Sequence, residues 1–252
     1  MVRIAAWVIA LALIAAPIIA ALNGWFADDR WPVRRLVVQG RFVHVDEGAV
    51  RKAVAGHVSG GFFAVELDQV RGAVEALPWV ASAEVRKYWP DRIAVRIVER
   101  VPIARWHGDR LLASDGAIFS ASAEDLPADL PRLQGPDARA AEVWAQYQAA
   151  RTRLAALGLS VVATRIDDRG AWSVVAADGA EFALGREQPM PRLDRFVAAI
   201  ARLPEVDIAR IARADLRFAN GFAVVWRPAV APVDATAPAP AVESRNVNEP
   251  QV

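Results

Sequence analysis

The sequence contains no cysteine, which excludes disulfide bonds, thiolate metal sites and a cysteine nucleophile. It has only three histidines, and no two of them stand four residues apart, as a helical metal site requires. It also lacks a Gly-x-Ser-x-Gly elbow, a Ser-x-x-Lys motif and a Gly-x-x-x-x-Gly-Lys phosphate loop. Charges nearly cancel, with 30 Lys and Arg against 29 Asp and Glu, which argues against a nucleic-acid-binding protein. We therefore predict no catalytic residue, no metal site and no cofactor.

A long uncharged apolar segment is present near the N-terminus, IAAWVIALALIAAPIIAAL at residues 4–22. As an α-helix it would span roughly 28 Å, close to the bilayer's hydrocarbon core of about 30 Å. A cleaved signal peptide is the alternative, but its apolar region is usually only about 7–15 residues long. We expect residues 1–27 to form a short cytoplasmic head and a transmembrane helix. Arginines flank both ends, so the orientation rests on the short head and the long following domain, which favour a cytoplasmic N-terminus.

Residues 33–100 show the pattern of a small β-α-α-β-β domain. VRRLVVQG at 33–40 predicts a strand, Asp46 fits the N-cap of a helix, and a second helix should stop at Pro78. Strands then follow on both sides of a turn at Trp89-Pro90. A domain this small needs bulky anchors, so we interpret Pro78, Trp79, Trp89 and Pro90 as structural, with both tryptophans clamping the helix–strand junction. The alternative is that the tryptophans line a binding site.

Residues 101–228 predict a second, mostly antiparallel β domain with two or more packed helices, so that the whole chain is α+β. Turn signals predict hairpins at HGDR (107–110) and Asp178-Gly179, a loop at LPRLQGP (130–136), and helices at about 137–157 and 193–203. Asn220-Gly221 is the strongest short hairpin signal, and FAVVW (222–226) should be the last strand. We expect a sheet edge there, which a partner strand can complete. Residues 229–252 are rich in Pro and Ala and predict a disordered tail.

The stretch FFAVELDQVRGAVEALPWVASAEVRKYWPDRIAVRIVERVPIARW (62–106) resembles the POTRA domain and following segment of the FtsQ/DivIB family of bacterial division proteins. LPRLQGP, RLDRFV (192–197) and DLRFANGFAVVW (215–226) extend the resemblance over most of residues 4–227. The residues that carry it in the first stretch are Phe62, Leu67, Val70, Leu77, Pro78, Trp79, Val80, Ala83, Val85, Arg86, Trp89, Pro90, Val95, Glu99, Pro102, Ala104 and Trp106.

The resemblance implies a partner-binding site, because in this family the last strand and its surroundings recruit FtsB, which is bound to FtsL. Carried over by position, the candidates are Phe218, Asn220, Gly221, Phe222, Val225 and Trp226. The family often has tyrosine where this chain has Phe218, whose ring carries no hydroxyl group. On the residues alone, Leu216, Phe218 and Trp226 fit a hydrophobic core equally well.

The function implied by the resemblance is that of a non-enzymatic, single-pass inner-membrane protein of the divisome, with periplasmic domains, concentrated at the septum. It would hold FtsB and FtsL and, through them, the septal peptidoglycan synthesis proteins FtsW and FtsI. The alternative is a POTRA-containing secretion or outer-membrane assembly factor, but the sequence lacks the series of lipid-facing strands of about 10 residues that a membrane barrel needs. A wall hydrolase would need a catalytic carboxylate pair, nucleophile or metal, and we find none.

Overall fold

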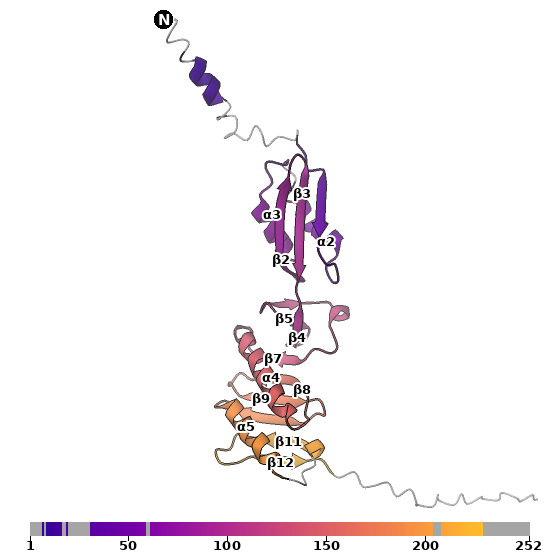
Figure 1. Cartoon of the computed structure of the whole chain (residues 1–252), viewed down its shortest axis with the longest axis vertical. Helices are drawn as coiled ribbons and strands as arrows, with labels where there is room; N and C mark the ends of the chain where they lie inside the picture. Colours follow the sequence, from indigo (N-terminus) through magenta and orange to yellow (C-terminus); the bar gives the residue numbers. More distant parts are fainter. Residues whose placement is uncertain are drawn as a thin grey trace, which may run out of the picture.

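The computed structural model describes residues 7, 9–16, 19, 31–58, 61–203 and 208–228. A three-stranded sheet and a nine-stranded sheet follow one another along an elongated molecule (Figure 1). Residues 9–16 are helical, and no helix within the described ranges is long and apolar enough to span a bilayer. The transmembrane helix predicted at 4–22 lies partly outside the described residues, and the tail at 229–252 lies entirely outside them.

The first module has the predicted β-α-α-β-β order. Its middle strand β3 pairs in parallel with β1 and antiparallel with β2. The Asp46 carboxylate caps the first helix, as predicted, by accepting a hydrogen bond from the Ala49 N–H at 3.0 Å. Both helices bury valines against the sheet, which closes a small core. The elements are β1 (Arg35–Gln39), α2 (Glu47–Ala55), α3 (Leu67–Glu75), β2 (Val80–Tyr88) and β3 (Arg92–Glu99).

The second sheet is mixed but mostly antiparallel, as predicted, with five antiparallel and three parallel pairings in the order β12-β11-β10-β9-β8-β7-β4-β5-β6. Helices cross over between β7 and β8 and between β10 and β11, and a helical crossover makes the strands it joins parallel. The segment predicted as a loop at 130–136 contains β7. The strands are β4 (Pro102–Trp106), β5 (Arg110–Ala113), β6 (Ile118–Ser120), β7 (Arg132–Gln134), β8 (Val161–Ile166), β9 (Trp172–Ala176), β10 (Glu181–Gly185), β11 (Ile211–Asp215) and β12 (Ala223–Trp226).

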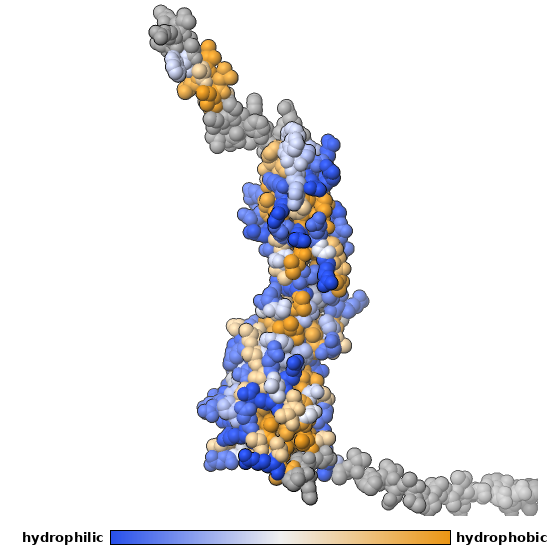
Figure 2. All heavy atoms as spheres, viewed as in Figure 1, coloured by the Kyte–Doolittle hydropathy of each residue, from blue (hydrophilic) through white to orange (hydrophobic). Residues whose placement is uncertain are grey.

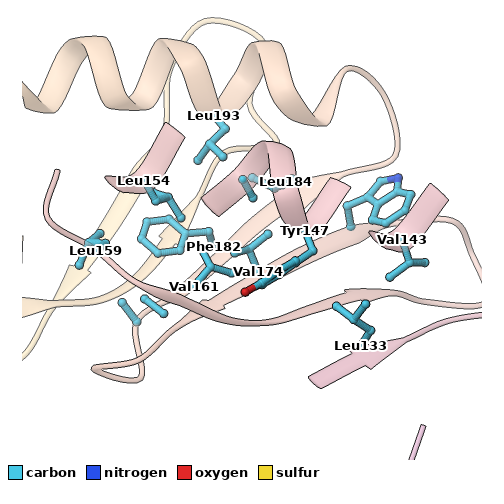
Figure 3. Packing of buried hydrophobic residues seen from close by; sticks show 14 of the residues in the cluster. Leu133, Val143, Tyr147, Leu154, Leu159, Val161, Val174, Phe182, Leu184 and Leu193 are labelled. Carbon is cyan, nitrogen blue, oxygen red and sulfur yellow. The ribbon is translucent and has the colours of Figure 1, made fainter. Parts of the chain in front are cut away.

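The two longest helices, α4 (Ala140–Ala155) and α5 (Pro189–Ile200), cover one face of this sheet, close to their predicted positions. Figure 3 shows Tyr147 and Leu154 pointing from α4 toward the aliphatic and aromatic side chains of the strands. Phe182 on β10 meets Phe196 on α5 edge to face, with ring centroids 5.6 Å apart. The opposite face of the sheet is not covered by α4 or α5.

The two sheets are joined by an apolar junction. Leu111, Ala113 and Phe119, from β5 and β6, belong to the buried cluster of the first module. Arg100 reinforces the contact by donating its backbone N–H to the Trp79 carbonyl at 2.8 Å and pairing with Asp115 at 3.4 Å. The second sheet therefore contributes side chains to the core of the first.

Trp79 and Trp89 have opposite environments. Trp79 is 7% exposed. Its ring stacks on that of His44, with centroids 3.9 Å apart, and packs edge to face on that of Phe119, with centroids 4.9 Å apart. Trp89 is 70% exposed, so the prediction that both tryptophans clamp the junction is wrong for Trp89. The reason is its position in the turn beyond the last β2–β3 pair, Tyr88 with Arg92, where its side chain projects past the sheet.

Candidate partner-binding edge

Strand β12 is one of the two terminal strands of the nine-stranded sheet, the other being β6, and it pairs only with β11 among the described strands. A terminal strand has one row of backbone N–H and C=O groups that its own sheet does not use. The strand is four residues long and lies at the far end of the molecule from the three-stranded module (Figure 1). It therefore offers a short template for one added strand.

The position of β12 is fixed by contacts at both of its ends. Beyond its C-terminal end, the Arg227 guanidinium donates to the carbonyls of Asp178 and Ala209, each at 2.7 Å. Before its N-terminal end, Phe222 packs edge to face on Phe196 of α5, with centroids 5.0 Å apart. These contacts hold the strand in place while leaving its outer edge open.

The connection between β11 and β12 is not the tight hairpin predicted from Asn220-Gly221. The strands end at 215 and resume at 223, and neither Asn220 nor Gly221 has the positive φ that a two-residue turn needs. Tertiary contacts override the local turn signal. The Leu216 N–H bonds the Ala183 carbonyl at 2.8 Å, and the Arg195 guanidinium holds the Ala219 carbonyl at 2.7 Å.

The six predicted partner-binding residues fall into two groups. Phe218, Val225 and Trp226 are 55%, 58% and 42% exposed, so the alternative that places Phe218 and Trp226 in the core is wrong. Leu216, in contrast, is buried. Asn220 and Gly221 are exposed in the loop, whereas Phe222 is partly buried and packs on the core. The structure thus presents an apolar surface beside an open strand edge.

Sequence reasoning missed a groove of about 710 Å³ on the sheet face opposite α4 and α5. Its lining includes small side chains from β8, β9 and β10 and arginines from β4, β7, β8 and β11. The groove reaches Arg213, whose register partner on β12 is Val225. One sequence signal could have predicted the groove. Along the strands, arginines occupy positions that alternate with buried residues, which places the arginines on the sheet face opposite the core. The five arginines are Arg105, Arg132, Arg165, Arg213 and Arg217.

The charges of this groove are only partly compensated. Arg217 donates to both oxygens of Asp215, and this hydrogen bonding lowers the pKa of the Asp215 carboxyl, which keeps it ionised. Arg105, Arg132 and Arg165 have no carboxylate partner among the described residues, and Arg105 and Arg132 stand side by side on β4 and β7. The groove is therefore electropositive at the end away from β12.

Nothing in the described ranges resembles a metal centre, because no three His, Asp or Glu side chains gather closely enough to hold an ion. Besides apolar side chains and arginines, the groove lining includes His107, Asp167 and Glu181.

Comparison with known proteins gives a consistent picture. Residues 31–100 match the family described as POTRA domain, FtsQ-type, and residues 104–217 match Cell division protein FtsQ/DivIB, C-terminal. The second match ends at residue 217, within the β11–β12 loop. The chain is 44% identical to the cell division protein FtsQ of Xanthomonas campestris over 225 residues, which cover 89% of this chain and 81% of the relative.

Two further relatives carry the same name. The identity is 35% to FtsQ of Allochromatium vinosum, with 78% of this chain and 79% of the relative covered. It is also 35% to FtsQ of Burkholderia pseudomallei, with 82% and 85% covered. With a POTRA module, a β-rich second sheet and these matches along nearly its whole length, the chain belongs to the FtsQ/DivIB family of cell division proteins.

Proposed function

We propose that the chain is a non-enzymatic scaffold of the bacterial division machinery that recruits a partner by strand addition at β12. The observation that carries this proposal is the open β12 edge with exposed Val225 and Trp226 beside it. An added strand would satisfy the unused backbone groups of β12, and Phe218 and Trp226 would supply apolar contact. Family membership favours this role over a secretion or outer-membrane assembly factor.

The partner we propose is FtsB in complex with FtsL, as the family resemblance implies, with FtsW and FtsI recruited indirectly. The electropositive groove supports a partner whose chain extends beyond the strand added at β12. Acidic side chains of that extension would lie over the arginines of the groove. Arg165 and Arg132 lie on the same open face of the sheet as Val225 of β12. Complementary charge raises the rate of association and selects among partners more than it raises affinity.

We further propose that residues 4–22 anchor the chain in the inner membrane, with a cytoplasmic N-terminus and both modules, 33–100 and 101–228, in the periplasm at the septum. The apolar run supports this, being long enough to cross the hydrocarbon core. Anchoring the scaffold and its membrane partners in one plane raises their effective concentration for each other.

Photo-crosslinking in dividing cells tests the partner edge. A photoreactive amino acid is placed at Val225, and the control position is Val98 on β3, which has nearly the same exposure, 58% against 56%. We expect a specific adduct with FtsB at position 225, identified by mass spectrometry, and none at position 98. Equal capture at both positions, or no FtsB adduct at 225, would refute strand addition at β12.

A charge reversal tests the groove separately from the edge. Arg165→Glu should reduce FtsB capture at position 225, most clearly at low salt, because it places a negative charge where we propose acidic partner residues. The control is Arg151→Glu on the exposed surface of α4, away from the groove lining. If both variants capture FtsB equally well, the groove does not contribute to binding.

A further inference from the structure

Four aromatic side chains are exposed together at the end of the three-stranded module where β1 and β3 begin. They are Trp31, Phe63, Tyr88 and Trp89, and we call them the tip patch. Trp89, the most exposed tryptophan of the module, lies with its ring centroid 6.2 Å from that of Trp31. In Figure 2 this end of the module shows pale and orange surface beside blue. The cores of the two sheets do not use this surface.

The tip patch is held together by hydrogen bonds to backbone carbonyls between segments far apart in the sequence. The Phe62 N–H donates to the Trp31 carbonyl at 2.7 Å, and the Lys87 ammonium donates to the Phe63 carbonyl at 3.3 Å. The Arg34 N–H bonds the Asp91 carbonyl in the β2–β3 turn at 3.0 Å. The aromatic side chains therefore project from a fixed frame rather than from separate loops.

Cationic side chains surround the aromatic ones. Arg34 and Arg92 are exposed, and the Arg92 guanidinium lies 4.4 Å from the centre of the Tyr88 ring. The carboxylate in the turn, Asp91, is already paired with Arg35 at 3.0 Å. Amphipathic aromatic rings mixed with arginine and lysine are the composition that proteins place at the headgroup level of a bilayer.

The covalent chain brings the tip patch close to the proposed membrane anchor. Residue 31 follows the end of the apolar run at residue 22 by nine residues, which reach at most about 30 Å when fully extended. Residue 31 also leads directly into β1, so the chain enters the module at the tip and not at the junction with the second sheet. The headgroup layer adds several ångströms beyond the hydrocarbon core. If residues 4–22 cross the bilayer, as proposed above, the tip patch is the part of the module nearest to it.

We propose that the tip patch docks into the phospholipid headgroup region of the membrane that holds residues 4–22, with Trp31 and Trp89 at the interface and Arg34 and Arg92 on lipid phosphates. The proposal rests on the membrane anchoring proposed above. Docking would orient the module with β12 pointing away from the bilayer, because β12 lies at the opposite end of the molecule (Figure 1). Docking of the tip patch would then fix the distance between the β12 edge and the membrane surface.

Spin labels on the full chain, reconstituted in vesicles of phosphatidylethanolamine and phosphatidylglycerol, test the proposal. Because the chain has no cysteine, a single cysteine substitution gives one label site. Trp89→Cys reports on the tip. Val43→Cys is the matched control, since Val43 is 73% exposed against 70% for Trp89 and lies beside Glu99 at the other end of β3. Leu13→Cys reports on the anchor.

We expect a water-soluble nickel reagent to reach the label at position 89 severalfold less than the label at position 43, and oxygen to reach it more. Equal nickel accessibility at 89 and 43, with the label at 13 inaccessible, would refute the tip proposal and leave the anchor standing. Nickel access at position 13 would refute the anchor itself, and the tip proposal with it.

A second variant tests whether the aromatic rings cause the docking. With the label at Phe63→Cys, the double substitution Trp31→Ser and Trp89→Ser should raise nickel accessibility severalfold. Val98→Ser, which removes an exposed apolar side chain elsewhere in the module, should not change it. Unchanged thermal unfolding by circular dichroism shows that the variants fold. No change in the double variant would refute the role of the tryptophans.

Discussion

Glu99, at the end of β3, holds the loop that leads into α2, and its removal should destabilise the three-stranded module. Its carboxylate accepts hydrogen bonds from the backbone N–H groups of Val43 at 3.1 Å, His44 at 3.3 Å and Val45 at 2.9 Å. Its side chain is only 10% exposed. Hydrogen bonds to a charged group contribute about 1.5–3 kcal/mol each. Because Val43 is exposed and its N–H can bond water instead, we expect Glu99→Ala to cost about 2–4 kcal/mol of unfolding free energy.

Thermal unfolding and hydrogen exchange of the α2 amides measure this loss. For a module of this size, about 1 kcal/mol corresponds to a Tm shift of about 4–8 °C, so Glu99→Ala should lower the Tm of the module by at least about 8 °C. The control is Glu84→Ala on β2, whose carboxylate pairs with nearby Arg86 at the surface and should contribute less than about 1 kcal/mol. If the two variants lose the same stability, the carboxylate of Glu99 does not hold the loop.

Three further predictions test the packing. Trp79→Ala should cost about 3–5 kcal/mol because the ring is buried at the junction, whereas Trp89→Ala should leave urea unfolding nearly unchanged; similar losses would contradict the assigned burial. Phe222→Ala should cost roughly 1–2 kcal/mol and speed hydrogen exchange in β12 but not in β8; uniform exchange would show that Phe222 does not hold the edge. Asp137→Asn should lower the Tm at neutral pH, because the hydrogen bond from Arg110 lowers the pKa of the Asp137 carboxyl. The ionised form is favoured on folding, so the gap in Tm between wild type and Asp137→Asn should persist above the unfolded pKa of about 3.9 and close as pH falls through the lower folded pKa; a pH-independent gap would contradict this.

Local patterns predicted the three-stranded module well. The cap at Asp46, the stop before Pro78 and the turn at Trp89-Pro90 act within a few residues of themselves, so the strands and helices they bound can be found without tertiary information. The two hairpins predicted in the second half, β4–β5 and β9–β10, also form, for the same reason. The burial of Trp89 was predicted wrongly because both tryptophans sit beside a proline, and only the packing of Phe119 and His44 around Trp79 distinguishes them.

By itself, the sequence determined the order of the elements in the three-stranded module, the two long helices of the second half, and the family resemblance along most of the chain. Only the tertiary structure decided that β7 lies between β4 and β8, that β5 and β6 complete the core of the first module, and that β12 lies on the far side of β11 from β10. It also replaced the Asn220-Gly221 hairpin with a longer loop. These features depend on contacts across many residues of sequence, such as Phe222 on Phe196, and such contacts outweigh a local turn preference because they bury apolar surface.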